Sequence, residues 1–166
     1  RIASTTDQDG PFFDAGAFPW LAALEEASEV LAREYLDACA EGQEPVSLRM
    51  LAGQDLPNIG PWRGLLLRDN VGWSTQGVAR CPVTAELLRT VPGIRSAMFS
   101  TLGPWARIAP HRGPNKGVLR AHVGVIVPEP ADRVTLWAGD EKVAWHQGRA
   151  FVFDDTYEHR VANRTD

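Results

Sequence analysis

Three of the four histidines in this sequence stand where imidazoles could bind a metal or an anionic ligand. His111 and His122 are eleven residues apart, with a turn rich in proline and glycine between them, so the pattern predicts a hairpin-like unit with one histidine at each end. His159 follows the apolar segment FVFDD and a turn. Imidazole nitrogen suits Fe, Zn, Cu and Ni, so a metal site is one hypothesis. His146, in the loop-like segment AWHQG, we interpret as an ordinary side chain.

The spacing alone leaves such a metal site incomplete. A non-haem Fe(II) oxygenase ordinarily binds iron through two histidines and a carboxylate, the carboxylate lying two residues after the first histidine. Here that position is Gly113, which offers no ligand. Asp154 and Asp155 come shortly before His159. Either one of them orients an imidazole as a hydrogen-bond acceptor, or both only end a strand in a turn, and the two interpretations stay open.

Short apolar segments bounded by glycine and proline must position these side chains. They read RGLLLRD, SAMFSTL, LRAHVGVIVP, RVTLWAG and RAFVFDD, and they predict a mainly β protein, a sandwich or a barrel. Apolar residues at helical spacing predict one long N-terminal helix from Trp20 to about Ala40. A short second helix is predicted in PVTAELLRTV. Trp137 and Trp145 we interpret as packing residues rather than as residues that stack on a substrate.

Composition narrows the classes of function. With 44% hydrophobic and 23% charged residues, the chain is expected to form a single globular domain over residues 1–166. The net charge is -4 and no extended run of Lys or Arg occurs, so we expect neither a nucleic acid nor a membrane as partner. No apolar run is long enough to span a bilayer. We favour free thiols at Cys39 and Cys81 over a disulfide, and a cytoplasmic location.

Two long segments resemble a known family. SAMFSTLGPWARIAPHRGPNKGVLRAHVGVIVP, followed by WHQGRAFVFDDTYEHRVANRTD, is similar to the aspartyl/asparaginyl β-hydroxylase family of Fe(II)/2-oxoglutarate-dependent dioxygenases. The similarity extends to PFFDAGAFPW and CPVTAELLRTVPG, and so to nearly the whole chain. It implies a double-stranded β-helix, the jelly-roll or cupin-like core, with the long N-terminal helix and the short second helix added.

The resemblance also implies a site. It makes His111 and His159 the two iron ligands, with Gly113 in the place of the usual acid. The residues implied to bind the co-substrate 2-oxoglutarate are Ser100, Arg120, His122 and Trp62. Arg112, beside the first iron ligand, is our candidate for contact with the substrate. A further co-substrate arginine is expected about ten residues after the second iron histidine, beyond Asp166. We favour a C-terminal strand that this sequence does not include over a co-substrate held by Arg120 alone.

The implied activity is hydroxylation of an unactivated C–H bond, at the β-carbon of an amino acid that is free, carrier-bound or within a peptide. The reaction would consume O2 and release succinate and CO2. Two alternatives remain open: a halogenase that uses the coordination position left free by Gly113, and a catalytically silent β-barrel binding module. We also expect Gly113→Asp to retain iron but to change turnover, provided that room exists for a carboxylate.

Overall fold

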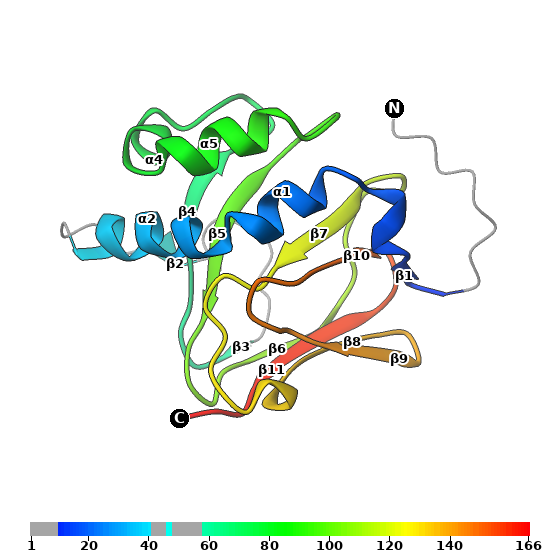
Figure 1. Ribbon diagram of the computed structural model, residues 1–166. Helices are drawn as coiled ribbons and strands as arrows, with labels where there is room; N and C mark the ends of the chain where they lie inside the picture. The colour runs from blue at the N-terminus through cyan, green and yellow to red at the C-terminus, as the bar shows by residue number, and fades with distance from the viewer. Residues whose placement is uncertain (1–9, 41–45, 48–57) are drawn as a thin grey trace.

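Antiparallel β-sheets make up most of the protein in a computed structural model, which describes residues 10–40, 46–47 and 58–166 (Figure 1). The first sheet has the strand order β1 (Phe12–Phe13), β10 (Ala150–Asp154), β7 (Leu119–Val123). The second has the order β3 (Asn58–Ile59), β6 (Arg107–His111), β11 (His159–Asn163), β8 (Val134–Ala138), β9 (Glu141–Ala144). The third has the order β2 (Val46–Ser47), β4 (Trp62–Arg68), β5 (Ala97–Leu102).

The prediction of a mainly β protein is confirmed. Each of the five predicted apolar segments contains a strand: β4, β5, β7, β8 and β10. The hairpin-like unit predicted around His111 and His122 is wrong. Strand β6 pairs with β11 and β3, whereas β7 pairs with β10, so the turn between the two histidines crosses from one sheet to another.

The single long N-terminal helix is also wrong, because the helical segment is divided into α1 (Leu21–Glu26) and α2 (Ser28–Ala40). At the break, the carboxylate of Glu25 accepts a hydrogen bond of 2.7 Å from the backbone N–H of Ala150, at the start of β10. Ser28 is buried, and its hydroxyl lies 3.1 Å from the point that a Cβ on Gly148 would occupy. Contact with the 148–150 turn therefore fixes where one helix ends and the next begins.

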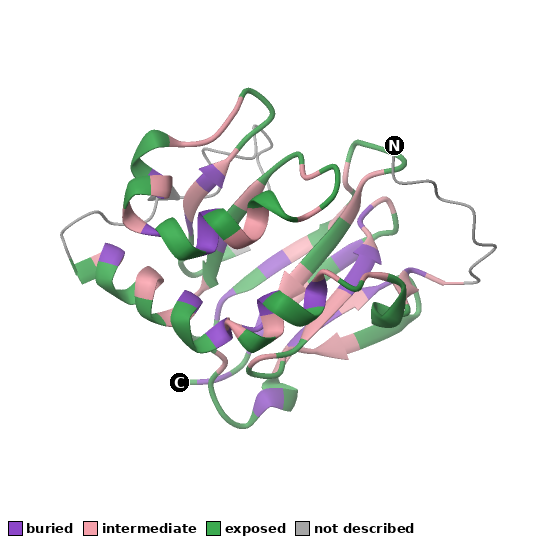
Figure 2. Cartoon of the chain, turned by 45° about the horizontal axis from the view of Figure 1, so that its top comes forward, coloured by how far each residue is buried: buried purple, intermediate pink, exposed green. Residues whose placement is uncertain are grey.

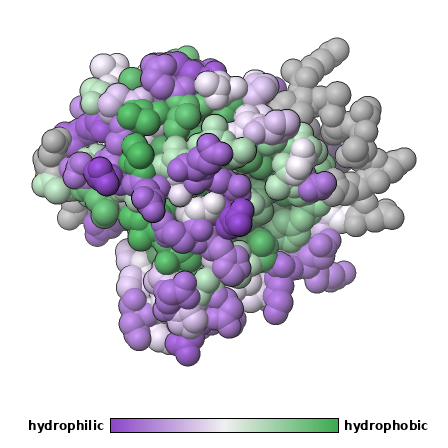
Figure 3. All heavy atoms as spheres, viewed as in Figure 1, coloured by the Kyte–Doolittle hydropathy of each residue, from purple (hydrophilic) through white to green (hydrophobic). Residues whose placement is uncertain are grey.

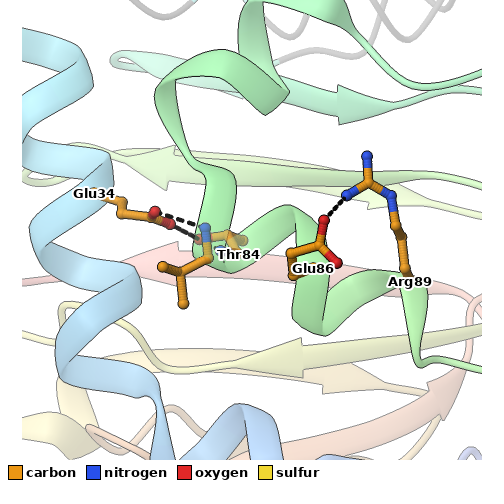
Figure 4. Close-up of polar contacts among 5 residues, drawn as sticks. Glu34, Thr84, Glu86 and Arg89 are labelled. Atoms are coloured by element: carbon orange, nitrogen blue, oxygen red, sulfur yellow. Dashed lines mark hydrogen bonds and ion pairs between the residues drawn. The ribbon is translucent and has the colours of Figure 1, made fainter.

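The short second helix is confirmed as α5 (Pro82–Arg89), and it is preceded by α4 (Thr75–Arg80), which the apolar pattern did not predict. Glu34 of α2 reaches the first turn of α5, where its carboxylate accepts hydrogen bonds from the backbone N–H groups of Val83 (2.8 Å) and Thr84 (2.9 Å) and from the Thr84 hydroxyl (Figure 4). A carboxylate at this position satisfies donors that a helix N-terminus leaves free. Two short 3-10 helices, η1 (Ala15–Ala17) and η2 (Ala131–Arg133), complete the described elements.

Two clusters of buried apolar side chains pack the helices and the three sheets together; buried residues are coloured purple in Figure 2. The first, between the helices and the third sheet, contains Leu31, Ala38, Leu67, Cys81 and Phe99. The second, between the other two sheets, contains Leu136, Ala138 and Phe153. Both cysteines are free thiols, and burial raises the pKa of the Cys81 thiol to about 11.

Over the face shown in Figure 3, polar and apolar side chains are interspersed. Among the helices that the structure describes, none has the length and the apolar character needed to cross a membrane.

Candidate metal and co-substrate site

Two imidazoles meet on neighbouring strands of the second sheet. His159, the first residue of β11, lies directly opposite His111, the last residue of β6. The ring centroids are 4.1 Å apart and the ring planes are inclined by 53°. The register of the two strands shifts just beyond His159, between His159 and Val161. Irregularities of this kind are frequent beside active sites, where they change the direction of a side chain.

Backbone carbonyls orient both rings. Nδ1 of His111 lies 2.9 Å from the carbonyl oxygen of Ala109, and Nδ1 of His159 lies 2.9 Å from that of Tyr157. Because a carbonyl oxygen can only accept, each Nδ1 carries a proton, so Nε2 is the nitrogen of each ring that would bind a metal. The hypothesis that Asp154 or Asp155 orients an imidazole is therefore wrong.

The two aspartates have different contacts. Asp154 accepts a hydrogen bond from the N–H of Thr156 at 2.9 Å and so stabilises the turn. Asp155 is buried, with 4% of its surface exposed, and one carboxylate oxygen accepts a hydrogen bond of 2.7 Å from Nε of Arg120. Its other oxygen, Oδ1, is buried and has no hydrogen-bond partner among the described residues. A buried carboxylate oxygen without a donor is unusual and indicates an absent partner, such as a metal-bound water.

Asp155 also explains Gly113. The N–H of Gly113 donates a hydrogen bond to the backbone carbonyl of Asp155, 2.6 Å away. A Cβ on Gly113 would lie 2.2 to 2.3 Å from the three atoms of the Asp155 carboxylate, far inside van der Waals contact. The carboxylate of Asp155 thus fills the space that a side chain at position 113 would need, and the room that Gly113→Asp requires is not there.

His122 lies in an aromatic pocket between the sheets. Its ring centroid is 5.7 Å from Trp145, 5.4 Å from Phe151 and 5.5 Å from Phe153, and Phe153 in turn lies 5.3 Å from His159. Burial and, to a smaller degree, the charge of Arg120 lower the pKa of His122 to about 4.

Arg120 stands two residues before His122 on β7, so the two side chains leave the same face of the strand. Burial lowers the pKa of His159 as well. At neutral pH both His122 and His159 are therefore uncharged, and a neutral imidazole is the form that binds metals.

The remaining predicted co-substrate residues lie on the third sheet. Nε1 of Trp62 donates a hydrogen bond of 3.1 Å to the hydroxyl of Ser100. On β5, the neighbours of Ser100 face helix α2: Tyr35 of that helix packs on Phe99 and hydrogen-bonds to Thr101. Because side chains alternate along a strand, Ser100 projects from the sheet face that the helix does not cover. The Trp62–Ser100 pair makes no hydrogen bond with the histidines in the described part of the chain.

Arg112 borders an open pocket of about 470 Å³, which His111 and His159 do not line. Its guanidinium donates a hydrogen bond of 3.0 Å to the carbonyl of Thr156. The pocket is lined by Arg112, Lys116, Gly117, Asp154, Thr156 and Tyr157. These residues belong to the segments that follow His111 and precede His159. His146, in contrast, is exposed in a loop.

The donor set fits a metal held by two imidazoles. Within the described residues, no group of three or more His, Cys, Asp or Glu side chains is arranged to hold a metal directly. His111 and His159 are the two imidazoles that would hold the metal, and Oδ1 of Asp155 supplies a buried acceptor. First-row metals bound by two protein ligands keep open positions for water or substrate.

The profile of the family described as Aspartyl/Asparaginyl beta-hydroxylase matches residues 20–166. The chain belongs to this family. The family assignment made from sequence is confirmed.

Two relatives show how the chain compares within this hydroxylase family. It is 33% identical over 159 residues to an ornithine lipid ester-linked acyl 2-hydroxylase from Rhizobium tropici, an alignment that covers 94% of this chain and 56% of that protein. It is 27% identical over 113 residues to a human aspartyl/asparaginyl beta-hydroxylase, covering 65% of this chain and 15% of that protein. The chain thus spans about half of the bacterial relative and a small part of the human one.

Proposed function

We propose that this chain is the catalytic domain of an Fe(II)/2-oxoglutarate-dependent hydroxylase, with a double-stranded β-helix as its core. The observation that carries the proposal is the pair of imidazoles of His111 and His159, centroids 4.1 Å apart, each with Nδ1 bound to a backbone carbonyl and Nε2 left for a metal. Fe(II), 2-oxoglutarate and O2 together supply the oxidant that hydroxylates an unactivated C–H bond, with release of succinate and CO2.

Asp155 takes the role of the missing third acid without binding the metal directly. Its buried Oδ1 has no protein donor among the described residues, so it would accept a hydrogen bond from a water on the metal. Its other oxygen holds Arg120 at 2.7 Å. The carboxylate therefore places negative charge beside the iron and fixes the arginine of the neighbouring strand.

Arg120 and His122 would bind the co-substrate. A guanidinium has five N–H donors, and only Nε of Arg120 is bound to Asp155, so its terminal nitrogens remain for a carboxylate of 2-oxoglutarate. Neutral His122 can donate one hydrogen bond from an otherwise apolar pocket. Ser100 and Trp62 would add a hydroxyl and an aromatic face from the third sheet. Phe151, Phe153 and Trp145 would exclude water from the reacting groups.

The crowding at Gly113 favours hydroxylation over halogenation. A halogenase must bind chloride where the acid would otherwise bind, and here the carboxylate of Asp155 already lies in that space. A chloride would meet a buried negative charge, which is unfavourable in a medium of low dielectric constant.

Two classes of substrate have support. The family description and the human relative favour the side chain of an amino acid, free, carrier-bound or in a peptide. The bacterial relative, aligned over 94% of this chain, favours a C–H bond in an acyl chain of a lipid. In both cases Arg112, which lines the open pocket together with Lys116, would bind an anionic group of the substrate.

A product assay tests the proposal. The protein is incubated with Fe(II), 2-oxoglutarate and, in separate reactions, Asp- and Asn-containing peptides, free amino acids and an ornithine lipid, each with and without chloride. We expect succinate together with a product that has gained one oxygen atom, independent of chloride. A chlorinated product would favour the halogenase. Stabilisation by 2-oxoglutarate without succinate would favour the silent binding module.

A further inference from the structure

The outer face of the second sheet gathers basic residues from distant parts of the chain. On this sheet Arg160 lies opposite Trp137, and Trp137 lies opposite Lys142, so the three side chains share one face. The other face carries His159 and Leu136, which point into the protein.

Two more arginines join the same face. Arg107 of β6 lies opposite Ala162, two residues after Arg160, so Arg107 and Arg160 share a face. The guanidinium of Arg164 lies 5.2 Å from the ring centroid of Trp137, and that of Arg160 lies 4.9 Å from it. We call Arg107, Lys142, Arg160 and Arg164, with Trp137 at their centre, the basic face.

Ion pairs within the described residues do not involve the cations of the basic face. Among the described residues, no carboxylate lies within ion-pair distance of these four cations. Two acidic groups close in sequence are directed elsewhere: the carboxylate of Glu141 lies beside Gly10, and that of Asp166 accepts a hydrogen bond from Trp105. Helices α1, α2, α4 and α5 lie on the other side of the molecule (Figure 1). The chain as a whole has a net charge of -4, so this face has the opposite sign to the whole.

We propose that the basic face docks on the surface of an anionic lipid bilayer. Several exposed cations on one sheet face, extended over three strands, complement a plane of negative headgroups, and each adds to the attraction. A single-stranded nucleic acid would need an aromatic ring open for stacking, and two guanidiniums already lie over Trp137. The proposal does not depend on the proposed function.

The basic face could not be predicted from runs of basic residues in the sequence. Its residues are spread between positions 107 and 164, and no two of its cations are adjacent in the chain. We expected no membrane partner because the sequence has no run of basic residues. Strand pairing brings separate basic residues onto one face, so the absence of a run does not exclude such a partner.

Vesicle sedimentation tests the docking surface. The protein is mixed with vesicles of equal parts phosphatidylcholine and phosphatidylglycerol, and with vesicles of phosphatidylcholine alone, at low and high salt. We expect binding only to the anionic vesicles, weakened by salt. Arg160→Gln combined with Arg164→Gln should weaken binding about fivefold for each cation, about 25-fold together.

Matched variants keep the test decisive. Arg33→Gln with Arg95→Gln removes the same charge from exposed positions away from the basic face and should bind like the parent. Arg160→Lys with Arg164→Lys keeps the charge and should also bind, which covers the case in which the Gln variants do not fold. The proposal is overturned if anionic vesicles do not bind the parent, if both Gln pairs weaken binding equally, or if a single-stranded oligonucleotide binds and the vesicles do not.

Discussion

At the scale of single residues, the carboxylate of Asp155 occupies the space that a side chain at position 113 would need. A side chain at 113 and the carboxylate at 155 cannot both be present, because the added Cβ would lie 2.2 Å from that carboxylate. The carboxylate that occupies this space is that of Asp155, in the turn before His159, and Arg120 donates a hydrogen bond to it. The two histidines and the glycine could be predicted from a motif. The role of Asp155 could not, because its partners lie 35 and 42 residues away in the chain.

Replacing Arg120 should separate co-substrate binding from charge pairing. Arg120→Ala removes a charge-assisted contact of about 1.5–3 kcal/mol, so 2-oxoglutarate should bind roughly ten- to a hundredfold more weakly. It also leaves the buried carboxylate of Asp155 unpaired. Because Arg120 is itself nearly half exposed, we expect a loss of stability of about 1–3 kcal/mol, below that of a fully buried pair. Urea denaturation and 2-oxoglutarate titration measure the two effects.

A second substitution supplies the control for that prediction. Asp155→Asn in the Arg120→Ala background removes the unpaired charge and should restore most of the lost stability, while 2-oxoglutarate binding stays weak. If the double variant binds 2-oxoglutarate as tightly as the parent, Arg120 has no direct role in binding it.

Gly113→Asp should be destabilising rather than neutral. The new carboxylate must displace that of Asp155, so the variant combines overpacking of at least about 1–3 kcal/mol with repulsion between like charges. Thermal unfolding of the metal-free protein measures the effect, and Gly72→Asp, where no atom lies within 4 Å of an added Cβ, is the control. A variant with parental stability would show that Asp155 does not occupy this space.

At the scale of elements, local pattern predicted the strands but not the contacts between elements. Apolar segments bounded by Gly and Pro identified β4, β5, β7, β8 and β10. This was possible because the order of apolar and polar residues within a segment shows whether one or both faces of the strand are buried. The break between α1 and α2 depends on Glu25 meeting Ala150, 125 residues away, and no local pattern contains that contact. The pairing of β6 with β11 could not be predicted either, because the two strands are far apart in the sequence.

The contact between α2 and α5 gives a prediction at this scale. Glu34→Ala leaves two backbone N–H groups and a hydroxyl of the first turn of α5 without their acceptor, so we expect a loss of about 1–3 kcal/mol. Glu86→Ala, which breaks an exposed pair with Arg89 in the same helix, should change stability by no more than about 0.5 kcal/mol (Figure 4). Equal effects in urea denaturation would contradict the capping role.

At the scale of the whole molecule, the fold holds the imidazoles of His122 and His159 uncharged. The free energy of unfolding therefore depends on pH. The pKa of His122 is about 4 in the folded chain and about 6.5 when unfolded. Between these values the unfolded chain binds more protons, so stability must fall as the pH falls from about 6.5 to 4. Burial lowers the pKa of His159 and acts in the same direction.

Replacing His122 by phenylalanine, which cannot be protonated, tests this dependence of stability on pH. In metal-free protein, His122→Phe should flatten the decrease of the free energy of unfolding between pH 6.5 and 4, measured by urea denaturation at each pH. His146→Phe, at an exposed loop position, should leave the decrease as in the parent. An unchanged slope in His122→Phe would mean that His122 is not held neutral by the fold.

The central claim is that His111 and His159 together hold Fe(II) for 2-oxoglutarate to bind, and anaerobic titration tests it most directly. The Fe(II)-loaded protein is titrated with 2-oxoglutarate while the metal-to-ligand charge-transfer absorbance is recorded. We predict a saturable band in the parent and in His146→Ala, and none in His111→Ala or His159→Ala. Absence of the band in the parent, or an undiminished band in His111→Ala, would contradict the account.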